Sequence, residues 1–126
     1  MKIECAVSLG ELVDKLSILM IKEKKINNPE KLVHIRHEQS ILENTLNSLN
    51  LAGITLHLEK MIEVNLKLWQ IEDDIRDCER KKEFSQSFID LARAVYVTND
   101  VRFELKNKIN LEYKSNIVEV KSYQKY

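Results

Sequence analysis

Residues 54–82, ITLHLEKMIEVNLKLWQIEDDIRDCERKK, follow the turn sequence NLAG at 50–53 and contain neither glycine nor proline. Apolar residues recur along them at three- and four-residue steps, which predicts one helix of roughly eight turns at 3.6 residues per turn. Ser85 or Ser87 can cap a further helix, which is predicted to run to about Tyr113. Two long helices joined by a few residues form an antiparallel hairpin roughly 40 Å long. This hairpin is the predicted centre of the fold.

The N-terminal half predicts two more helices. Ser8 and Glu11 match S-x-x-E, the capping box in which the serine caps the helix and the glutamate reaches back to the serine amide. The helix that starts there has an apolar face and is predicted to run to about Lys25. Asn28 followed by Pro29 predicts the start of the second helix, because asparagine caps well and proline tolerates the first helical position.

The second helix carries a seam of apolar residues at alternating three- and four-residue steps, broken by one glutamine. The seam residues are Leu32, Ile35, Gln39, Leu42, Leu46 and Leu49. Such a seam packs lengthwise on another helix, which is either a helix of the same chain or one of a second subunit. We expect a homo-oligomer, both from this seam and because a chain this narrow has little interior of its own.

The two ends of the chain differ from the helical middle. Residues 2–7, KIECAV, alternate enough to form a short strand, and residues 114–126 are rich in β-branched and aromatic side chains. The tail can pair with the N-terminal strand or lie along the helices. The sequence therefore predicts one all-α domain over residues 1–126, a helical bundle built on the long antiparallel hairpin, with short terminal β-strands as an option.

Composition limits the classes of function. Twenty Lys and Arg balance twenty Asp and Glu, so no overall field draws the protein to nucleic acid or to an anionic membrane. Cys5 and Cys78 lack the spacing of a zinc site or a redox pair and are interpreted as reduced thiols. The N-terminus does not match a signal peptide, and no apolar run is long enough to span a bilayer. We expect a soluble cytoplasmic protein.

Both long helices carry polar stripes that packing does not require. On a helical wheel the stripe of the third helix consists of Asn65, Trp69, Glu72, Asp73 and Arg76. The fourth helix carries two adjacent lines, of which one is Arg93, Tyr96 and Asp100, and the other is Asn99, Arg102, Lys106 and Asn110. If the hairpin brings these stripes together, cations, amides and aromatic rings share one surface.

These residue types suit a planar ligand that carries phosphate. Arginine binds phosphate oxygens through paired hydrogen bonds and lysine adds a point charge, while aromatic rings stack on bases and asparagine reads polar edges. The alternative is purely structural: arginines and carboxylates on facing helices often form only ion pairs, and Trp69 can be a core residue. On the first helix, Glu11, Asp14, Lys15 and Lys22 are interpreted as a solvated face, with Lys15 or Lys22 as optional supplements to the anion site.

Carboxylate clusters raise a second alternative, an enzyme. Glu11 and Asp14 form E-x-x-D, and an acidic series follows Glu72 on the third helix, so facing helices could hold Mg²⁺. The arrangement resembles the all-α nucleoside triphosphate pyrophosphohydrolases, although their paired E-x-x-E and E-x-x-D segments are not reproduced and arginines interrupt the acids. His34 and His37 lie three residues apart without a third ligand nearby, and they and His57 are interpreted as surface residues.

Several segments together resemble a known but uncharacterised family. They are SLGELVDKLSILMIK (8–22), NLKLWQIEDDIR (65–76), FIDLARAVYVTNDVRFELKNKIN (88–110) and EVKSYQKY (119–126). The family consists of short helical proteins of bacteria and phages, some encoded among surface-polysaccharide glycosyltransferase genes. It is a domain-of-unknown-function family, so the resemblance implies a helical fold and no activity. It also marks polar positions, which include Lys15, Lys22, Ser115, Lys121 and Tyr123.

We therefore expect non-catalytic binding or sequestration of a phosphate-containing small molecule, a nucleotide or a nucleotide-derived signal. In a phage such a protein would act as an anti-defence sponge. The expected ligand-binding residues are Asn65, Trp69, Glu72, Arg76, Arg93, Tyr96, Asn99, Arg102, Lys106, Lys121 and Tyr123. No catalytic residue, metal ligand, cofactor, nucleic acid or membrane partner is assigned. The alternatives are the Mg²⁺-dependent enzyme and a helical scaffold for polysaccharide-biosynthesis proteins.

Overall fold

The computed structural model describes all residues, 1–126, and is built from four helices. They are α1 (Leu9–Lys25), α2 (Pro29–Ser48), α3 (Ile54–Lys81) and α4 (Gln86–Glu112). No strand forms. The predicted all-α helical bundle is therefore confirmed, and the helices begin and end within about two residues of the predicted bounds.

The helix ends follow from local capping chemistry. The Ser8 side chain accepts a hydrogen bond from the Glu11 amide at 3.1 Å, and Asn28 caps α2 through the Lys31 amide at 3.1 Å. Gly53 precedes α3 with φ +80°, a left-handed conformation that glycine adopts without strain. The second half of the predicted capping box is wrong, because the Glu11 carboxylate pairs with Lys106 of α4 at 3.3 Å instead.

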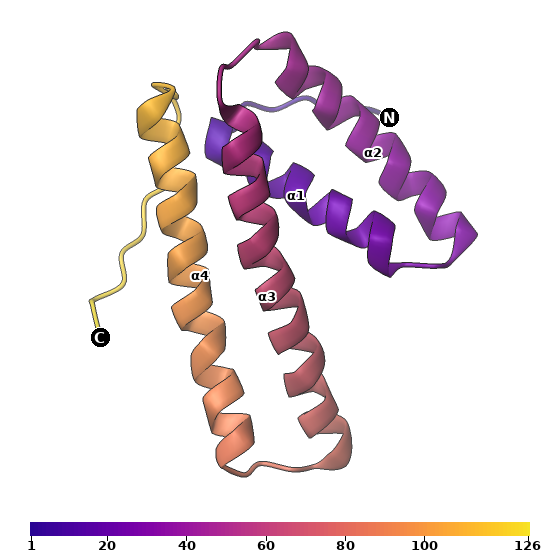
Figure 1. Ribbon diagram of the computed structural model, residues 1–126, viewed down its shortest axis with the longest axis vertical. Coiled ribbons are helices and arrows are strands. Elements are labelled where there is room, and N and C mark those ends of the chain that lie inside the picture. The colour runs from indigo at the N-terminus through magenta and orange to yellow at the C-terminus, as the bar shows by residue number, and fades with distance from the viewer.

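The α3–α4 hairpin is the long axis of the molecule, as predicted (Figure 1). α1 crosses one end of the hairpin and packs against α2, α3 and α4, so that it has neighbours on three sides. The hydrophobic core lies at this crossing and contains Leu12, Val13, Leu16, Leu46, Met61 and Ile109. The opposite end of the hairpin consists of α3 and α4 alone.

The crossing of α1 and α4 depends on a glycine. A Cβ atom placed on Gly10 would lie 2.5 Å from the carbonyl oxygen of Lys106 and 2.9 Å from its Cα atom. Only a residue without a side chain lets the two backbones approach this closely. The Gly10 amide also donates to the Asn110 side-chain oxygen at 2.7 Å, which ties the start of α1 to the end of α4.

The apolar seam of α2 faces α1 within the same chain. Ile35 and Leu46 are buried, and Leu42 packs against the core cluster. Of the two partners that the sequence left open for this seam, the structure shows the internal one. The expected homo-oligomer stays a prediction and no longer draws support from the seam.

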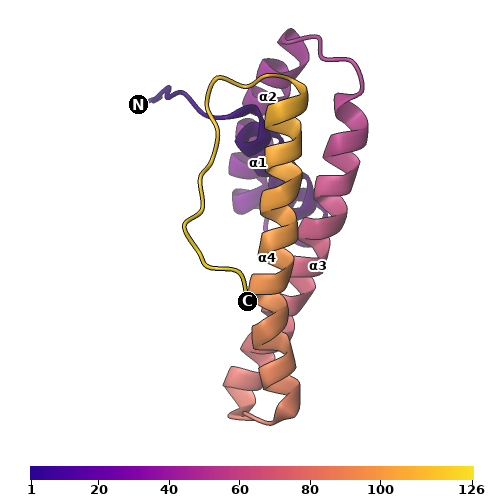
Figure 2. The ribbon, with the colours of Figure 1, turned by 90° about the vertical axis from the view of Figure 1, so that its left-hand side faces the viewer.

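The terminal segments do not pair with each other. Residues 1–7 are exposed, and residues 118–126 pass along α4 as an extended tail (Figure 2). The predicted strand option is therefore wrong, because the tail packs beside a helix whose backbone hydrogen bonds are already made within the helix. None of the helices combines the length and the apolar character that a membrane span requires.

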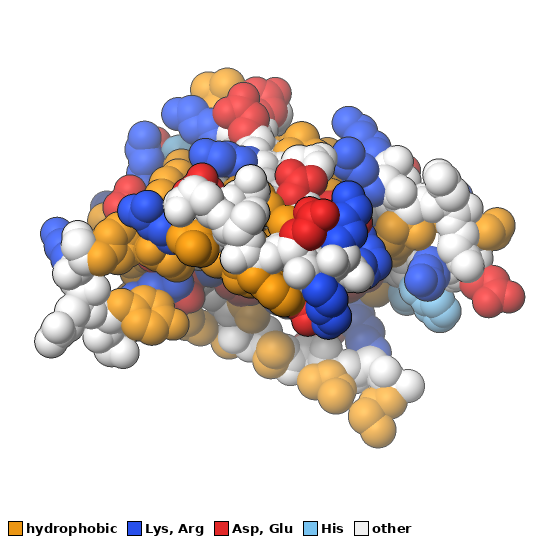
Figure 3. Space-filling view, turned by 90° about the horizontal axis from the view of Figure 1, so that it is seen from below, with side chains coloured by type: hydrophobic (Ala, Val, Ile, Leu, Met, Phe, Trp, Pro, Cys, Tyr) orange, Lys and Arg blue, Asp and Glu red, His pale blue; other side chains and the backbone are white.

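Charged side chains of both signs are interspersed on the molecular surface. Viewed from the α3–α4 turn, Lys and Arg alternate with Asp and Glu, and hydrophobic side chains show between them (Figure 3). This matches the equal numbers of acidic and basic residues in the sequence. A field that attracts a ligand must therefore be local.

Candidate functional site

A polar cluster lies inside the molecule where α1 crosses the hairpin. Asp14 and Ser17 of α1 are fully buried at 0% exposure, and Asn65 of α3 is 5% exposed. Arg102 of α4 reaches the same point with a side chain that is 27% exposed. Buried polar groups need hydrogen-bond partners, and here each of these four residues supplies them to the others.

Asp14 is the centre of this cluster. Its Oδ1 accepts from Asn65 Nδ2 at 2.9 Å and from Arg102 Nε at 2.8 Å, and its Oδ2 accepts from Arg102 Nη2 at 2.5 Å. The paired bonds hold the guanidinium by one edge. Hydrogen bonding to Asp14 raises the pKa of Arg102 above its usual value, although partial burial opposes this. Arg102 therefore stays charged and fixed in orientation.

The cluster also fixes the Asn65 amide. Its nitrogen donates to Asp14 and, at 2.7 Å, to Ser17 Oγ, while the Ser17 hydroxyl donates to the Asp14 backbone carbonyl at 2.6 Å. Both neighbours of this nitrogen are acceptors, which defines the orientation of the amide. The Asn65 carbonyl oxygen forms no hydrogen bond within the protein and remains available as an acceptor.

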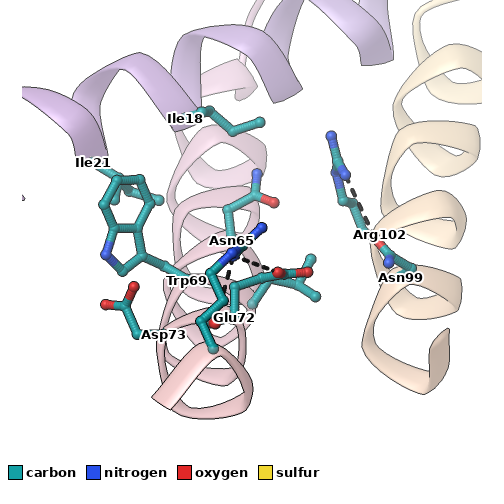
Figure 4. Close-up of a pocket in the computed structure, with 10 residues that line it drawn as sticks. Ile18, Ile21, Asn65, Trp69, Glu72, Asp73, Asn99 and Arg102 are labelled. Carbon is teal, nitrogen blue, oxygen red and sulfur yellow. Dashed lines mark hydrogen bonds and ion pairs between the residues drawn. The ribbon is translucent and has the colours of Figure 1, made fainter. Parts of the chain in front are cut away.

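A cavity of about 420 Å³ adjoins this cluster and lies between α1, α3 and α4. Its lining residues are Ile18, Ile21, Asn65, Leu68, Trp69, Glu72, Asp73, Arg76, Asn99 and Arg102. In Figure 4 the indole of Trp69 and the carboxylate of Asp73 lie on one side, Asn65 in the middle, and Arg102 with Asn99 on the other. The predicted stripes of α3 and α4 thus meet at one cavity, with two isoleucines of α1 as its wall.

Arg76 contributes a cation of a different kind. It is mostly exposed and pairs with Glu72 of the same helix, with Nη1 donating to Oε2 at 2.6 Å. An exposed pair one helical turn apart contributes only about 0.5 kcal/mol, so another anion can replace Glu72 at little cost. The cavity therefore has one fixed cation, Arg102, and one that is free to reorient.

Five of the predicted ligand-binding residues lie outside this cavity. Lys106 is 7% exposed and pairs with Glu11 at 3.3 Å and with Glu119 at 2.6 Å. Tyr96, Lys121 and Tyr123 line a second cavity between α4 and the C-terminal tail, and Arg93 is exposed on α4 and lines neither. The structure thus joins Asn65, Trp69, Glu72, Arg76, Asn99 and Arg102 at one cavity, which none of the remaining five lines.

The sequence-based interpretation of Asp14 as part of a solvated face is wrong. Asp14 is fully buried because α1 has neighbours on three sides, which leaves it less solvated surface than an amphipathic helix at the rim of a bundle. A signal was present in the sequence: Gly10, Asp14, Ser17 and Ile21 recur at steps of four, three and four. Two small residues on one line indicate a close helix contact, and the acid between them needs a partner there.

Both carboxylates of the E-x-x-D segment, on which the enzyme alternative depends, are already paired. Glu11 pairs with Lys106 and Asp14 with Arg102, so the E-x-x-D segment presents no free carboxylate to a metal ion. No group of three or more His, Cys, Asp or Glu side chains is placed to hold a metal. The geometry therefore gives this alternative no support.

Comparison with known proteins identifies the family. The chain belongs to DUF6165, a family of unknown function, and the match covers residues 1–126. This confirms the resemblance to an uncharacterised domain family. No curated protein and no solved structure matches the chain. Function must therefore be argued from the cavity itself.

Proposed function

We propose that the chain binds, without transforming it, a small molecule that combines a phosphate group with a planar ring, such as a nucleotide, in the cavity between α1, α3 and α4. The observation that carries the proposal is the arrangement of Arg102. Asp14 occupies Nε and one hydrogen of Nη2, so Nη1 and the second hydrogen of Nη2 are left for another anion. Nη1 has only a long contact, 3.5 Å, to Asn99.

The Arg102 guanidinium is preorganised to bind an anionic ligand. Its ordering is provided by the fold, so binding costs less conformational entropy than it would for a free arginine. Arg76 lines the same cavity and can exchange its exposed Glu72 partner for a phosphate oxygen. Two arginines, one fixed and one adjustable, supply enough donors for a single phosphate group.

The rest of the cavity suits a planar ring. The Trp69 indole offers a stacking face beside Ile18 and Ile21, and the Asn65 carbonyl offers an acceptor to a ring N–H or amino group. A volume of about 420 Å³ lies within the range of small-ligand sites. Trp69 and Asn65 of α3 with the isoleucines of α1 would thus hold the ring, and Arg102 of α4 with Arg76 of α3 would hold the phosphate.

The lining residues favour binding over turnover. The lining contains no Ser, Cys, His or Lys, so a nucleophile paired with a base is missing from it. Glu72 is paired with Arg76, which leaves Asp73 as the one lining carboxylate outside an ion pair. Such a site holds a ligand, and sequestration of that ligand is the use we propose for it.

Trp69, the only tryptophan, provides the readout. We expect saturable changes in its fluorescence, together with a raised melting temperature, on titration with members of a panel of nucleotides, cyclic nucleotides, ADP-ribose and nucleotide-sugars. Adenosine and inorganic phosphate, each offering half of the ligand, should bind more weakly. Chromatography after incubation with Mg²⁺ should recover the bound compound unchanged.

A matched pair of variants tests the location of the site. Arg76→Gln should weaken binding roughly tenfold, the loss of one hydrogen-bonded charge. Arg80→Gln is the control, since Arg80 also pairs with a carboxylate one turn away on the same helix, Asp77, but does not line this cavity. Equal weakening by both variants, silence of Trp69 with every compound, or conversion of the ligand would each overturn the proposal. If no compound changed Trp69 fluorescence and changes on the Leu32–Leu49 face abolished binding of a protein partner, the scaffold alternative would be favoured.

A further inference from the structure

A second cavity, of about 960 Å³, lies on the other side of α4, between this helix and the C-terminal tail. Its lining comes from Val95–Val97, Asn99–Val101, Phe103 and Glu104 of α4 and from Lys121 and Tyr123–Tyr126 of the tail. Asn99 is the one residue that it shares with the cavity beside Trp69. The two cavities therefore differ in their walls and in their chemistry.

Aromatic rings dominate this second cavity, and a cation already lies among them. Phe103, Tyr96, Tyr123 and Tyr126 all line it. Lys121 Nζ lies 5.4 Å from the ring centroid of Phe103 and 5.4 Å from that of Tyr123. Both distances fall inside the range in which an ammonium group is attracted to an aromatic face.

Two carboxylates line the same cavity. Asp100 and Glu104 lie one helical turn apart on α4 and both line the cavity. The Tyr126 hydroxyl donates to Asp100 Oδ2 at 2.6 Å, and the Tyr126 ring meets Tyr96 edge to face with centroids 5.3 Å apart. Aromatic faces combined with nearby acids are the arrangement that recognises alkylated ammonium groups.

The tail side of the cavity is loosely held. Tyr123 and Tyr126 are each 79% exposed, and the tail has no backbone hydrogen bonds to α4. Side-chain contacts alone hold the tail on α4: Glu119 pairs with Lys106 just before the cavity, and within the cavity Tyr126 contacts Asp100 and Lys121 contacts Phe103. The tail can therefore open to admit a ligand and close over it.

We propose that this aromatic cavity binds an organic cation of the alkylammonium type and that Lys121 is the chain's own occupant of the cation position. An external cation would displace the Lys121 ammonium from Phe103 and Tyr123. Its charge would be stabilised by the ring faces and by Asp100 and Glu104, and the tail rings would pack around its alkyl groups. This site does not depend on the nucleotide proposal, because the two cavities use different rings.

Choline and its neutral isostere 3,3-dimethyl-1-butanol test the proposal, because they share a shape and differ in charge. Two-dimensional amide NMR of the full chain should show saturable shifts with choline chloride in residues 96–104 and 118–126, against a sodium chloride control. The neutral compound should give much smaller shifts. Trp69 fluorescence should not change, which separates this site from the proposed nucleotide site.

Two variants sharpen the test. Lys121 lies on the tail, and Lys121→Gln should tighten choline binding about two- to fivefold, because the Lys121 ammonium no longer competes for the aromatic rings. Phe103→Leu keeps an apolar side chain and should weaken choline binding by a similar factor, while nucleotide titrations of Trp69 stay as in the parent chain. Equal shifts with choline and the neutral compound, no shift with either, or weaker binding by Lys121→Gln would each overturn the proposal.

Discussion

The two halves of the α3–α4 hairpin carry similar residues but are supported differently. The clasped half, residues 54–71 and 98–112, packs against α1 and holds every buried residue of both helices, Met61 and Ile109 among them. The free half, residues 72–81 and 86–97, contains no buried residue and extends beyond α1 (Figure 1). The hairpin is thus one continuous structure with two environments.

Charge pairing follows the same division. In the clasped half the ion pairs join different segments, as Arg102 with Asp14 and Lys106 with Glu11. In the free half they join residues one turn apart, as Arg76 with Glu72. A charged side chain covered by another helix pairs with a residue of a different segment, because the packing of the helices brings the two together. An exposed charged side chain pairs within its own helix. The candidate cavity lies at the border and draws one arginine from each half.

The largest effect should come from removing the acid at the centre of the clasped half. Asp14→Ala leaves Arg102 and Asn65 without their shared acceptor, and we expect the free energy of unfolding to fall by about 3 kcal/mol. Urea denaturation measures this. Asp77→Ala is the matched change in the free half, where loss of the solvent-exposed Arg80 pair should leave the urea denaturation midpoint almost unchanged. Similar losses at both positions would contradict the division.

A smaller effect should follow from closing the gap between α1 and α4. Gly10→Ala places a methyl group against the Lys106 backbone, which cannot rotate away as a side chain can. Overpacking of about 2–3 kcal/mol, offset by about 1 kcal/mol of helix propensity, predicts a net loss of roughly 1–2 kcal/mol. Calorimetric melting measures it. A stabilised variant, the usual result for glycine to alanine in an exposed helix, would show that the crossing is not tight.

The fold could be predicted from sequence because its signals are local. Ser8, Asn28 and Gly53 mark helix starts by their own side-chain or backbone chemistry, whatever surrounds them. The tail could not be assigned in the same way. Its β-branched and aromatic residues favour a strand only if a partner strand exists, and the neighbour that it meets is a helix.

The site could be predicted only in part. Periodicity shows which residues share a face of a helix, but it does not show how far along that face a neighbouring helix covers them. Asn65, Trp69 and Arg76 form one stripe on the wheel, yet α1 covers the first and leaves the last in solvent. Asp14 was missed for a related reason. A helical wheel with one apolar face assumes that the helix packs in one direction only, whereas α1 packs against three helices, α2, α3 and α4.

In the free half, shortening an apolar side chain should lower the free energy of unfolding less than the same change would in the hydrophobic core. Ile75 of α3 lies in the free half and is half-buried, and Ile75→Ala should lower the free energy of unfolding by about 1 kcal/mol, since water can fill the space that is left. The same urea titration measures it. A loss above about 2 kcal/mol would mean that the free half contributes a packed core of its own.

The smallest effect concerns the edge of the clasped half, where the tail meets α4. The hydrogen bond to Asp100 is the main cause that raises the pKa of the Tyr126 hydroxyl above its usual value, with burial and the nearby acids adding to it. A raised pKa means that the closed tail favours the protonated hydroxyl. The contact is therefore complete below the ordinary tyrosine value of about 10 and is lost as the pH rises through the raised value.

The titration of the Tyr126 hydroxyl is obtained by subtracting the tyrosinate absorbance titration of Tyr126→Phe from that of the parent chain. Its midpoint should lie above about 10, and Asp100→Asn should lower it, because the charged acceptor is removed. Global unfolding should not change in either variant, since Tyr126 is mostly exposed and the tail does not enter the core. A midpoint at the ordinary value would mean that the tail is not held at Asp100. The Tyr126 ring would then not be held beside Tyr96, whereas the buried cluster around Asp14 would be unaffected.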